Sequence, residues 1–231
     1  MLVGGKNVAK EILVSNKHIK KIYLEDNFND IDILSLIEDR NITPNYLSTK
    51  EINRFNKKRH QGIILEIDDF KYSPIEEFDV TNGKLVILDH LEDPHNLGAI
   101  IRTVESAGFT GIVIPKDRSV EVNYTAEKAS SGAATYVKIA KVTNLKQSIN
   151  YLKSIGYWII GTSLETKDDY RDISYDGKIA IVIGNEGKGI SPSLRKYLDY
   201  EVKIPMKGKI NSLNASVAAG IMIYEAIRND R

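Results

Sequence analysis

Cysteine is absent from the 231-residue sequence, and histidine occurs only four times. Without cysteine, the chain forms no disulfide framework, no thiolate zinc site and no cysteine nucleophile. The histidines lie at positions 18, 60, 90 and 95 and lack the spacing of metal ligands. We therefore expect no metal cofactor. A chain without cysteine is consistent with a reducing cytosol, and we expect a cytoplasmic location.

Long apolar runs and a strong charge of one sign are also missing. No run approaches the roughly 20 apolar residues that a membrane-spanning helix needs, so we expect no membrane partner. The first residues, Met1-Leu-Val-Gly-Gly, lack the pattern of a secretory signal. The net charge is only +1, so any nucleic-acid binding must come from local basic patches.

Two such basic patches lie near the N-terminus, at residues 17–21 and 54–60. A charge run is usually a solvated surface, whereas contact with RNA phosphates is the functional alternative. Phe55 lies inside the second patch, where it is either a core residue or a platform for base stacking. The candidate RNA-binding residues are Lys17, Lys20, Arg54, Lys57, Lys58 and Arg59.

The order of short strands and helices predicts two domains. Residues 1–70 read as a small α/β unit, and residues 71–83, with Pro74 and Asn82-Gly83, read as a linker. From residue 84 to 231, short β-branched strands alternate regularly with helices. This alternation predicts a mostly parallel sheet that is covered on both faces.

Two apolar runs near the C-terminus, 179–183 and 202–205, each lead into a loop rich in Gly, Ser and Asn. Parallel strands that end side by side form a ligand crevice at the edge of an α/β sheet. The first loop, Gly184-Asn-Glu-Gly-Lys-Gly, fits neither the phosphate-loop nor the dinucleotide pattern. Glu186 is either a helix cap or loop ion pair, or a ligand-binding residue.

Two further segments carry polar groups at the start of predicted helices. In the first, Asn96 occupies an expected N-cap position, and Arg102 and Glu105 are spaced for an intrahelical ion pair. Together with the strand end before them, these residues also suit a phosphate. In the second, residues 211–216 hold more hydroxyl and amide groups than one helix cap requires, including Ser212 and Asn214.

In order, spacing and content, these three segments resemble the three motifs of the SpoU/TrmH family of RNA ribose 2′-O-methyltransferases, part of the SPOUT superfamily. The resemblance covers residues 84–228. Residues 3–13 and 60–63 are similar to the ribosomal-protein-like substrate-binding domain of many members. They resemble in particular the bacterial type that methylates a guanosine ribose of large-subunit (23S) rRNA.

The resemblance implies a C-terminal domain with a trefoil knot that binds S-adenosylmethionine in a bent form. It also implies a homodimer whose active site is completed across the interface. By position, the cofactor-binding residues would be Thr162, Gly184, Ile204 and Leu213.

The resemblance implies six catalytic residues: Asn96, Arg102, Glu105, Glu186, Ser212 and Asn214. A guanidinium is a poor base because its pKa exceeds about 12. We therefore expect Arg102 to anchor the adjacent phosphate and to stabilise the developing alkoxide. Asn96 would position Arg102 or the ribose, the two glutamates would orient basic groups, and Ser212 and Asn214 would fix the nucleotide.

Two alternatives remain open at this stage. One is a member of the family that acts on tRNA, although the N-terminal unit favours rRNA. The other is a non-catalytic RNA-binding protein that has kept the fold. The presence of five candidate catalytic residues argues against it: Asn96, Arg102, Glu186, Ser212 and Asn214.

Overall fold

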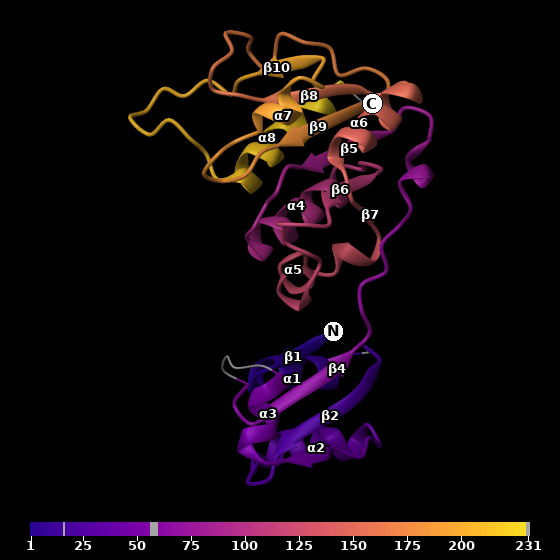
Figure 1. Ribbon diagram of the computed structural model, residues 1–231, viewed down its shortest axis with the longest axis vertical. Coiled ribbons are helices and arrows are strands. Elements are labelled where there is room, and N and C mark those ends of the chain that lie inside the picture. The colour runs from indigo at the N-terminus through magenta and orange to yellow at the C-terminus, as the bar shows by residue number, and fades with distance from the viewer. Residues whose placement is uncertain (16, 56–59, 230–231) are drawn as a thin grey trace. The chain divides into compact units, whose positions relative to one another are not determined.

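The computed structural model describes residues 1–15, 17–55 and 60–229. The chain divides into two compact units, Met1–Phe70 and Lys71–Arg231, each with its own sheet (Figure 1).

In its described residues, the first unit is a four-stranded mixed sheet with three helices. The strand order is β1-β4-β2-β3, with β1 at Leu2–Gly4, β2 at Ile19–Glu25, β3 at Asn45–Leu47 and β4 at Ile63–Ile67. Helices α1 (Lys6–Val14) and α2 (Ile31–Asp39) are amphipathic and bury one apolar side each, and α3 spans Thr49–Phe55. Because Ile22, Leu24 and Leu65 are fully buried, β2 and β4 form the centre of this core.

The second unit contains a six-stranded sheet in which every strand pair is parallel. The strand order is β10-β8-β9-β5-β6-β7. The strands are β5 (Lys84–Leu88), β6 (Gly111–Pro115), β7 (Lys138–Val142), β8 (Trp158–Thr162), β9 (Ile179–Ile183) and β10 (Tyr200–Val202). All residues of β5, β6 and β9 are buried, as expected for strands covered on both faces. The predicted parallel α/β fold is confirmed.

Within residues 71–229, five α-helices accompany this sheet: α4 (Pro94–Ser106), α5 (Tyr124–Ala129), α6 (Leu145–Ser154), α7 (Pro192–Arg195) and α8 (Ala215–Ala226). A short 3-10 turn, η2, spans Ala133–Thr135. One face of the sheet forms a buried cluster with α6 and α7 that includes Ile87, Val182 and Ile149. Helices α4 and α8 pack against each other, and α8 also contacts β9 (Figure 1). The carboxyl ends of the central strands therefore lie near the start of α4 and α8.

The predicted linker, residues 71–83, is partly built into the second unit. It contains the 3-10 helix η1 (Ile75–Phe78), whose Phe78 side chain is fully buried. The Tyr157 hydroxyl donates a 2.7 Å hydrogen bond to the Phe78 carbonyl, and a Cβ atom at Gly83 would collide with the Tyr157 ring system. The second half of this stretch is therefore core structure.

Helix α4 begins two residues earlier than the sequence predicts. Its N-cap is Asp93, which accepts a hydrogen bond from the His95 N–H, so the expectation that Asn96 caps this helix is wrong. Pro94 favours this start because its fixed φ suits the first helical position.

At the other end, Gly108 adopts a φ of 69°. The amides of Gly108 and Phe109 donate to the carbonyls of Glu105 and Val104, which is a Schellman motif.

Candidate active site

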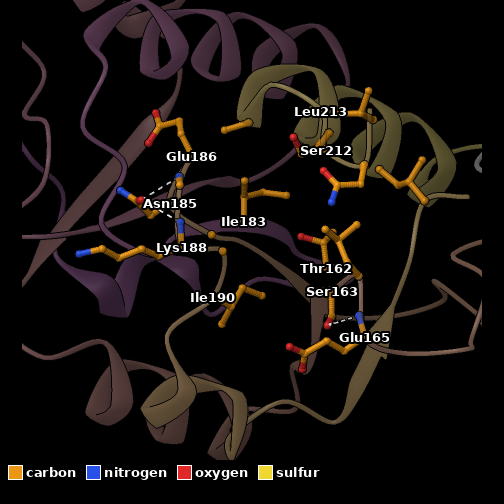
Figure 2. Close-up of a pocket in the computed structure, with 18 of the residues that line it drawn as sticks. Thr162, Ser163, Glu165, Ile183, Asn185, Glu186, Lys188, Ile190, Ser212 and Leu213 are labelled. Atoms are coloured by element: carbon orange, nitrogen blue, oxygen red, sulfur yellow. Dashed lines mark hydrogen bonds between the residues drawn. The ribbon is translucent and has the colours of Figure 1, made fainter. Parts of the chain in front are cut away.

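A pocket of about 450 Å³ lies at the carboxyl ends of β8 and β9 (Figure 2). Its walls are the end of β8 with residues 163–165, the end of β9 with residues 184–190, and parts of the segment 204–218. This volume is within the usual range for small-molecule sites. The position agrees with the crevice predicted from the two strand ends.

The four candidate cofactor-binding residues all line this pocket. Thr162 ends β8, Gly184 follows β9, and Ile204 and Leu213 lie in the segment between β10 and α8. The pocket also has an apolar lining from Ile183, Ile190, Ile204, Met206 and Leu213. Figure 2 shows Thr162 and Leu213 on the side opposite the glycine-rich loop. An apolar slot bordered by loop backbone is suited to a flat heterocycle with hydrogen-bonding edges.

The glycine-rich loop is shaped by a residue that the sequence analysis did not single out, Asn185. Its Oδ1 accepts hydrogen bonds from the amides of Gly187 and Lys188 at 3.0 and 3.3 Å (Figure 2). Its backbone exchanges two hydrogen bonds with Gly189. A Cβ atom at Gly184 would collide with the backbone of Gly189 and Ile190. The loop thus folds tightly back on the end of β9, which only glycine at position 184 permits.

Three candidate catalytic side chains form one hydrogen-bonded chain across the three motif segments. The Nδ2 of Asn96 donates to Oε1 of Glu186, and the Nδ2 of Asn214 donates to Oδ1 of Asn96, both at 3.0 Å. Asn96 is only 6% exposed, so both ends of its amide are used inside the protein. Asn214 is also the N-cap of α8, since its Oδ1 accepts from the Ser216 amide. Glu186 and Ser212 line the pocket.

Arg102 and Glu105 are exposed on α4 and do not line the pocket. Arg102 Nη1 donates to Oγ of Ser131 at 3.3 Å. Among the described residues, no ion pair joins Arg102 to Glu105 and no hydrogen bond joins Arg102 to Asn96. The structure therefore brings four of the six candidates to the pocket or its edge and leaves these two on the surface of α4.

A second group missed in the sequence lies at the other rim of the pocket. Arg195 donates to Glu165 at 2.6 Å and to Glu201 at 3.0 Å, and it also contacts the Ser163 hydroxyl. The hydrogen bond to Glu165 raises the pKa of the Arg195 guanidinium, which is therefore charged at neutral pH. This cluster ties the segment after β8 to α7. Its partners are six to thirty-two residues apart, so no local pattern reveals them.

The candidate RNA-binding residues belong to the first unit. Lys20 forms an ion pair with Asp68 at 3.2 Å. Arg54 is exposed at the end of α3, and the ring of the neighbouring Phe55 stacks on Tyr23 at 4.8 Å. Lys17 is partly exposed. Lys57, Lys58 and Arg59 lie outside the described residues.

The described residues offer neither a metal site nor a membrane span. Within residues 1–15, 17–55 and 60–229, no three or more acidic or histidine side chains are grouped as a metal site would require. In the same ranges, no helix has the length and apolar character needed to cross a bilayer.

The comparison with family models covers nearly the whole chain. Residues 83–224 match the SpoU rRNA methylase family, and residues 2–73 match the RNA 2′-O ribose methyltransferase substrate-binding family. A TrmH family tRNA/rRNA methyltransferase of Staphylococcus haemolyticus is 38% identical over 99% of this chain and 95% of its own length. The corresponding Bacillus subtilis protein, YacO, is 37% identical over 98% and 94%.

Solved structures are also similar to this chain. An rRNA methyltransferase of Sinorhizobium meliloti with bound AdoMet superposes with a TM-score of 0.69 at 25% identity, covering 100% of this chain and 87% of that one. A TrmH/SpoU tRNA-modifying enzyme of A. aeolicus gives a TM-score of 0.59 at 32% identity, covering 67% of this chain and 78% of that one. With the SPOUT fold and both family models matched, the chain belongs to the SpoU/TrmH family of RNA methyltransferases.

Proposed function

We propose that this protein transfers a methyl group from S-adenosylmethionine to a ribose 2′-oxygen of RNA, at a guanosine of large-subunit rRNA. The observation that carries the proposal is the Glu186–Asn96–Asn214 chain at the edge of the pocket. It joins all three family motifs at one place and leaves Glu186 and Ser212 facing the same cavity.

The pocket fits S-adenosylmethionine on its own chemistry. The apolar lining suits an adenine ring, and the backbone around Gly184, Ile204 and Leu213 offers N–H and C=O groups to its edge. Thr162 adds a hydroxyl at the end of β8. When bound, the cofactor would supply an electrophilic methyl group on a sulfonium. The family's trefoil knot, which we infer for residues around this pocket, would wrap the segment 204–213 over it.

The protein's own contribution is positioning and charge stabilisation. The bond from the 2′-oxygen to the methyl carbon would form as the bond from that carbon to sulfur breaks, and the hydroxyl proton would leave to solvent water. This in-line displacement needs the oxygen, the carbon and the sulfur aligned, so fixed side chains carry much of the rate enhancement. Ser212 and Asn214 would hold the nucleotide, while Asn96 keeps Glu186 and Asn214 in place. Arg102 would bind the neighbouring phosphate and stabilise the developing alkoxide. Glu105, which forms no ion pair with Arg102 among the described residues, would orient other basic groups.

We also propose that the active unit is a homodimer. Apart from Ser216 and Glu225, helix α8 consists of apolar and aromatic residues, yet Val217 and Tyr224 are 49% and 53% exposed. A helix of this kind is usually buried on all sides, and a second copy would cover its open side. Because Arg102 does not line the pocket of its own chain, we propose that it serves the pocket of the second copy.

The first unit would bind the RNA, in a protein that works in the cytoplasm. It matches the substrate-binding family model, and α3 ends with the exposed Arg54 followed by Phe55, which is 43% exposed and whose ring stacks on Tyr23. An exposed guanidinium suits a phosphate, and an exposed aromatic ring suits a base. Lys17, Lys20, Lys57, Lys58 and Arg59 would add further phosphate contacts. The second candidate substrate is tRNA, because the A. aeolicus relative is a tRNA-modifying enzyme.

The test is transfer of labelled methyl from S-adenosylmethionine to separate pools of rRNA and tRNA, followed by nuclease digestion to locate the label. The expected result is one labelled 2′-O-methylguanosine in large-subunit rRNA. Label in tRNA would keep the reaction and replace the substrate. Cofactor binding without transfer to either RNA or to ribosomal particles would indicate a non-catalytic RNA-binding protein.

A further inference from the structure

We propose that Asp89 and His90, directly after β5, are positioning residues that hold both ends of the loop 184–191 and thereby set the affinity of the cofactor pocket. This inference rests on the proposed function. Neither residue lines the pocket, whereas residues 184–190 form a large part of its wall.

The Asp89 carboxylate holds the far end of the loop. It is only 2% exposed, and its Oδ2 accepts a 2.7 Å hydrogen bond from the Ser191 amide. Ser191 is the N-cap of α7, so this contact fixes the point where the loop becomes a helix. The other carboxylate oxygen of Asp89, Oδ1, lies 2.6 Å from Nδ1 of His90. Burying a carboxylate costs free energy unless its oxygens have partners. Both oxygens of Asp89 have one, which agrees with a role in holding the loop.

His90 holds the near end of the loop. Its φ of 58° is in the left-handed region, which is unusual for a residue with a side chain. In this conformation the His90 carbonyl accepts a 2.9 Å hydrogen bond from Nδ2 of Asn185. Asn185 in turn organises the loop by accepting from the Gly187 and Lys188 amides (Figure 2). The contact between Asp89 and His90 therefore links Asn185, near the start of the loop, to Ser191 at its end.

These contacts predict an effect on cofactor binding rather than on the methyl-transfer step. Removing the carboxylate leaves the Ser191 amide without its acceptor and frees His90 to leave the left-handed conformation. The loop would then sample positions that narrow or open the pocket. Arg102 and Ser212, which we place at the reacting ribose, form no hydrogen bond or ion pair with Asp89 among the described residues, so turnover at saturating cofactor should persist.

The experiment compares Asp89→Ala with Asp89→Asn and with the exposed control Asp117→Ala. The probe is S-adenosylhomocysteine, with its affinity measured by calorimetry on the full chain. Asp89→Ala should weaken binding roughly 10-fold or more. Asp89→Asn should stay within about 3-fold, because its amide oxygen still accepts from Ser191 and its NH₂ can donate to His90. Asp117→Ala should match the wild type.

Steady-state kinetics separate weaker cofactor binding from a general loss of structure. For Asp89→Ala, KM for S-adenosylmethionine should rise in parallel with Kd while kcat changes less than about 3-fold. Unchanged affinity in a folded Asp89→Ala protein, or an equal loss in Asp89→Asn, would overturn the inference. If Asp89→Ala does not fold, His90→Ala decides: a few-fold weaker binding supports the inference and unchanged binding refutes it. A wild-type protein that binds no probe would instead refute the proposed function.

Discussion

The two halves of α4 differ in what they contact. At its start, Asn96 is buried and hydrogen-bonded to Glu186 and Asn214, so this end of the helix belongs to the pocket. Further along, Arg102 and Glu105 are exposed and away from the pocket lining. One helix therefore carries residues that build the cofactor site and residues that face outward. We infer that the outward half acts on RNA and on the pocket of a second copy.

The largest effect should come from the outward half. Arg102→Ala should lower kcat about 100-fold or more, because a charged donor to the developing alkoxide is lost. Its affinity for S-adenosylhomocysteine should remain within 2-fold of wild type, on the order of experimental scatter. Single-turnover methylation and calorimetry measure the two quantities. Lys116→Ala, which removes an exposed basic side chain directly after β6, is the matched control. An Arg102→Ala protein with full turnover would remove this residue from the mechanism.

The buried half should respond differently. Asn96→Ala leaves Glu186 and Asn214 without the amide that joins them, which should reduce the free energy of unfolding by about 1–3 kcal/mol. Activity should fall as well, because Asn214 also caps α8 and Glu186 faces the pocket. Urea denaturation monitored by circular dichroism checks the stability. If Asn96→Ala is as stable as wild type while activity is lost, the hydrogen-bonded chain is not structural and Asn96 acts on substrate directly.

The proposed dimer surface on α8 provides a third test, because the outward half of α4 is proposed to act on the pocket of a second copy. Val217→Glu places a charge on the open side of α8 and should raise the dimer dissociation constant roughly 10-fold or more. Sedimentation over a concentration series measures this change. Val80→Glu, a substitution of similar exposure in the second unit, should leave the oligomeric state unchanged. A wild-type protein that is monomeric at all concentrations contradicts the proposed dimer.

A smaller effect is expected in the first unit. Arg54→Ala should weaken RNA binding a few-fold and reduce the slope of log affinity against log salt by about 1. Filter binding at several salt concentrations measures both. Phe55→Leu should weaken binding without changing the slope, since stacking releases no counterions. Identical salt slopes for wild type and Arg54→Ala would exclude a phosphate contact at this residue.

The parallel sheet and the place of the pocket could be predicted because the information is local. Five-residue apolar strands such as Ile179–Ile183 read directly as buried strands, and a glycine-rich loop after such a strand marks a crevice. The sequence predicts Asn96 as the N-cap of α4, and this prediction is wrong: several polar residues compete near Pro94, and only the three-dimensional structure selects Asp93.

The sequence alone does not reveal which residues far apart in the chain become hydrogen-bond partners. Asp89 and Ser191 are 102 residues apart, and Asn96 and Asn214 are 118 apart. No local periodicity reports such pairs, so Asp89 and Asn185 look like ordinary loop residues until the sheet brings their partners close. The buried Phe78 shows the same limit: its segment is polar enough to read as a linker, yet its ring belongs to the core.

The most direct test of the contrast between the two halves of α4 is a mixing experiment. Arg102→Ala keeps an intact pocket, whereas Gly184→Val should block the pocket because a Cβ atom there collides with the loop. Each variant alone should be inactive. If Arg102 serves the pocket of the second copy, mixed dimers contain one complete site, and the mixture should recover about a quarter of the wild-type methylation rate. No recovery, despite proven exchange of subunits, would show that Arg102 acts within its own chain or not at all.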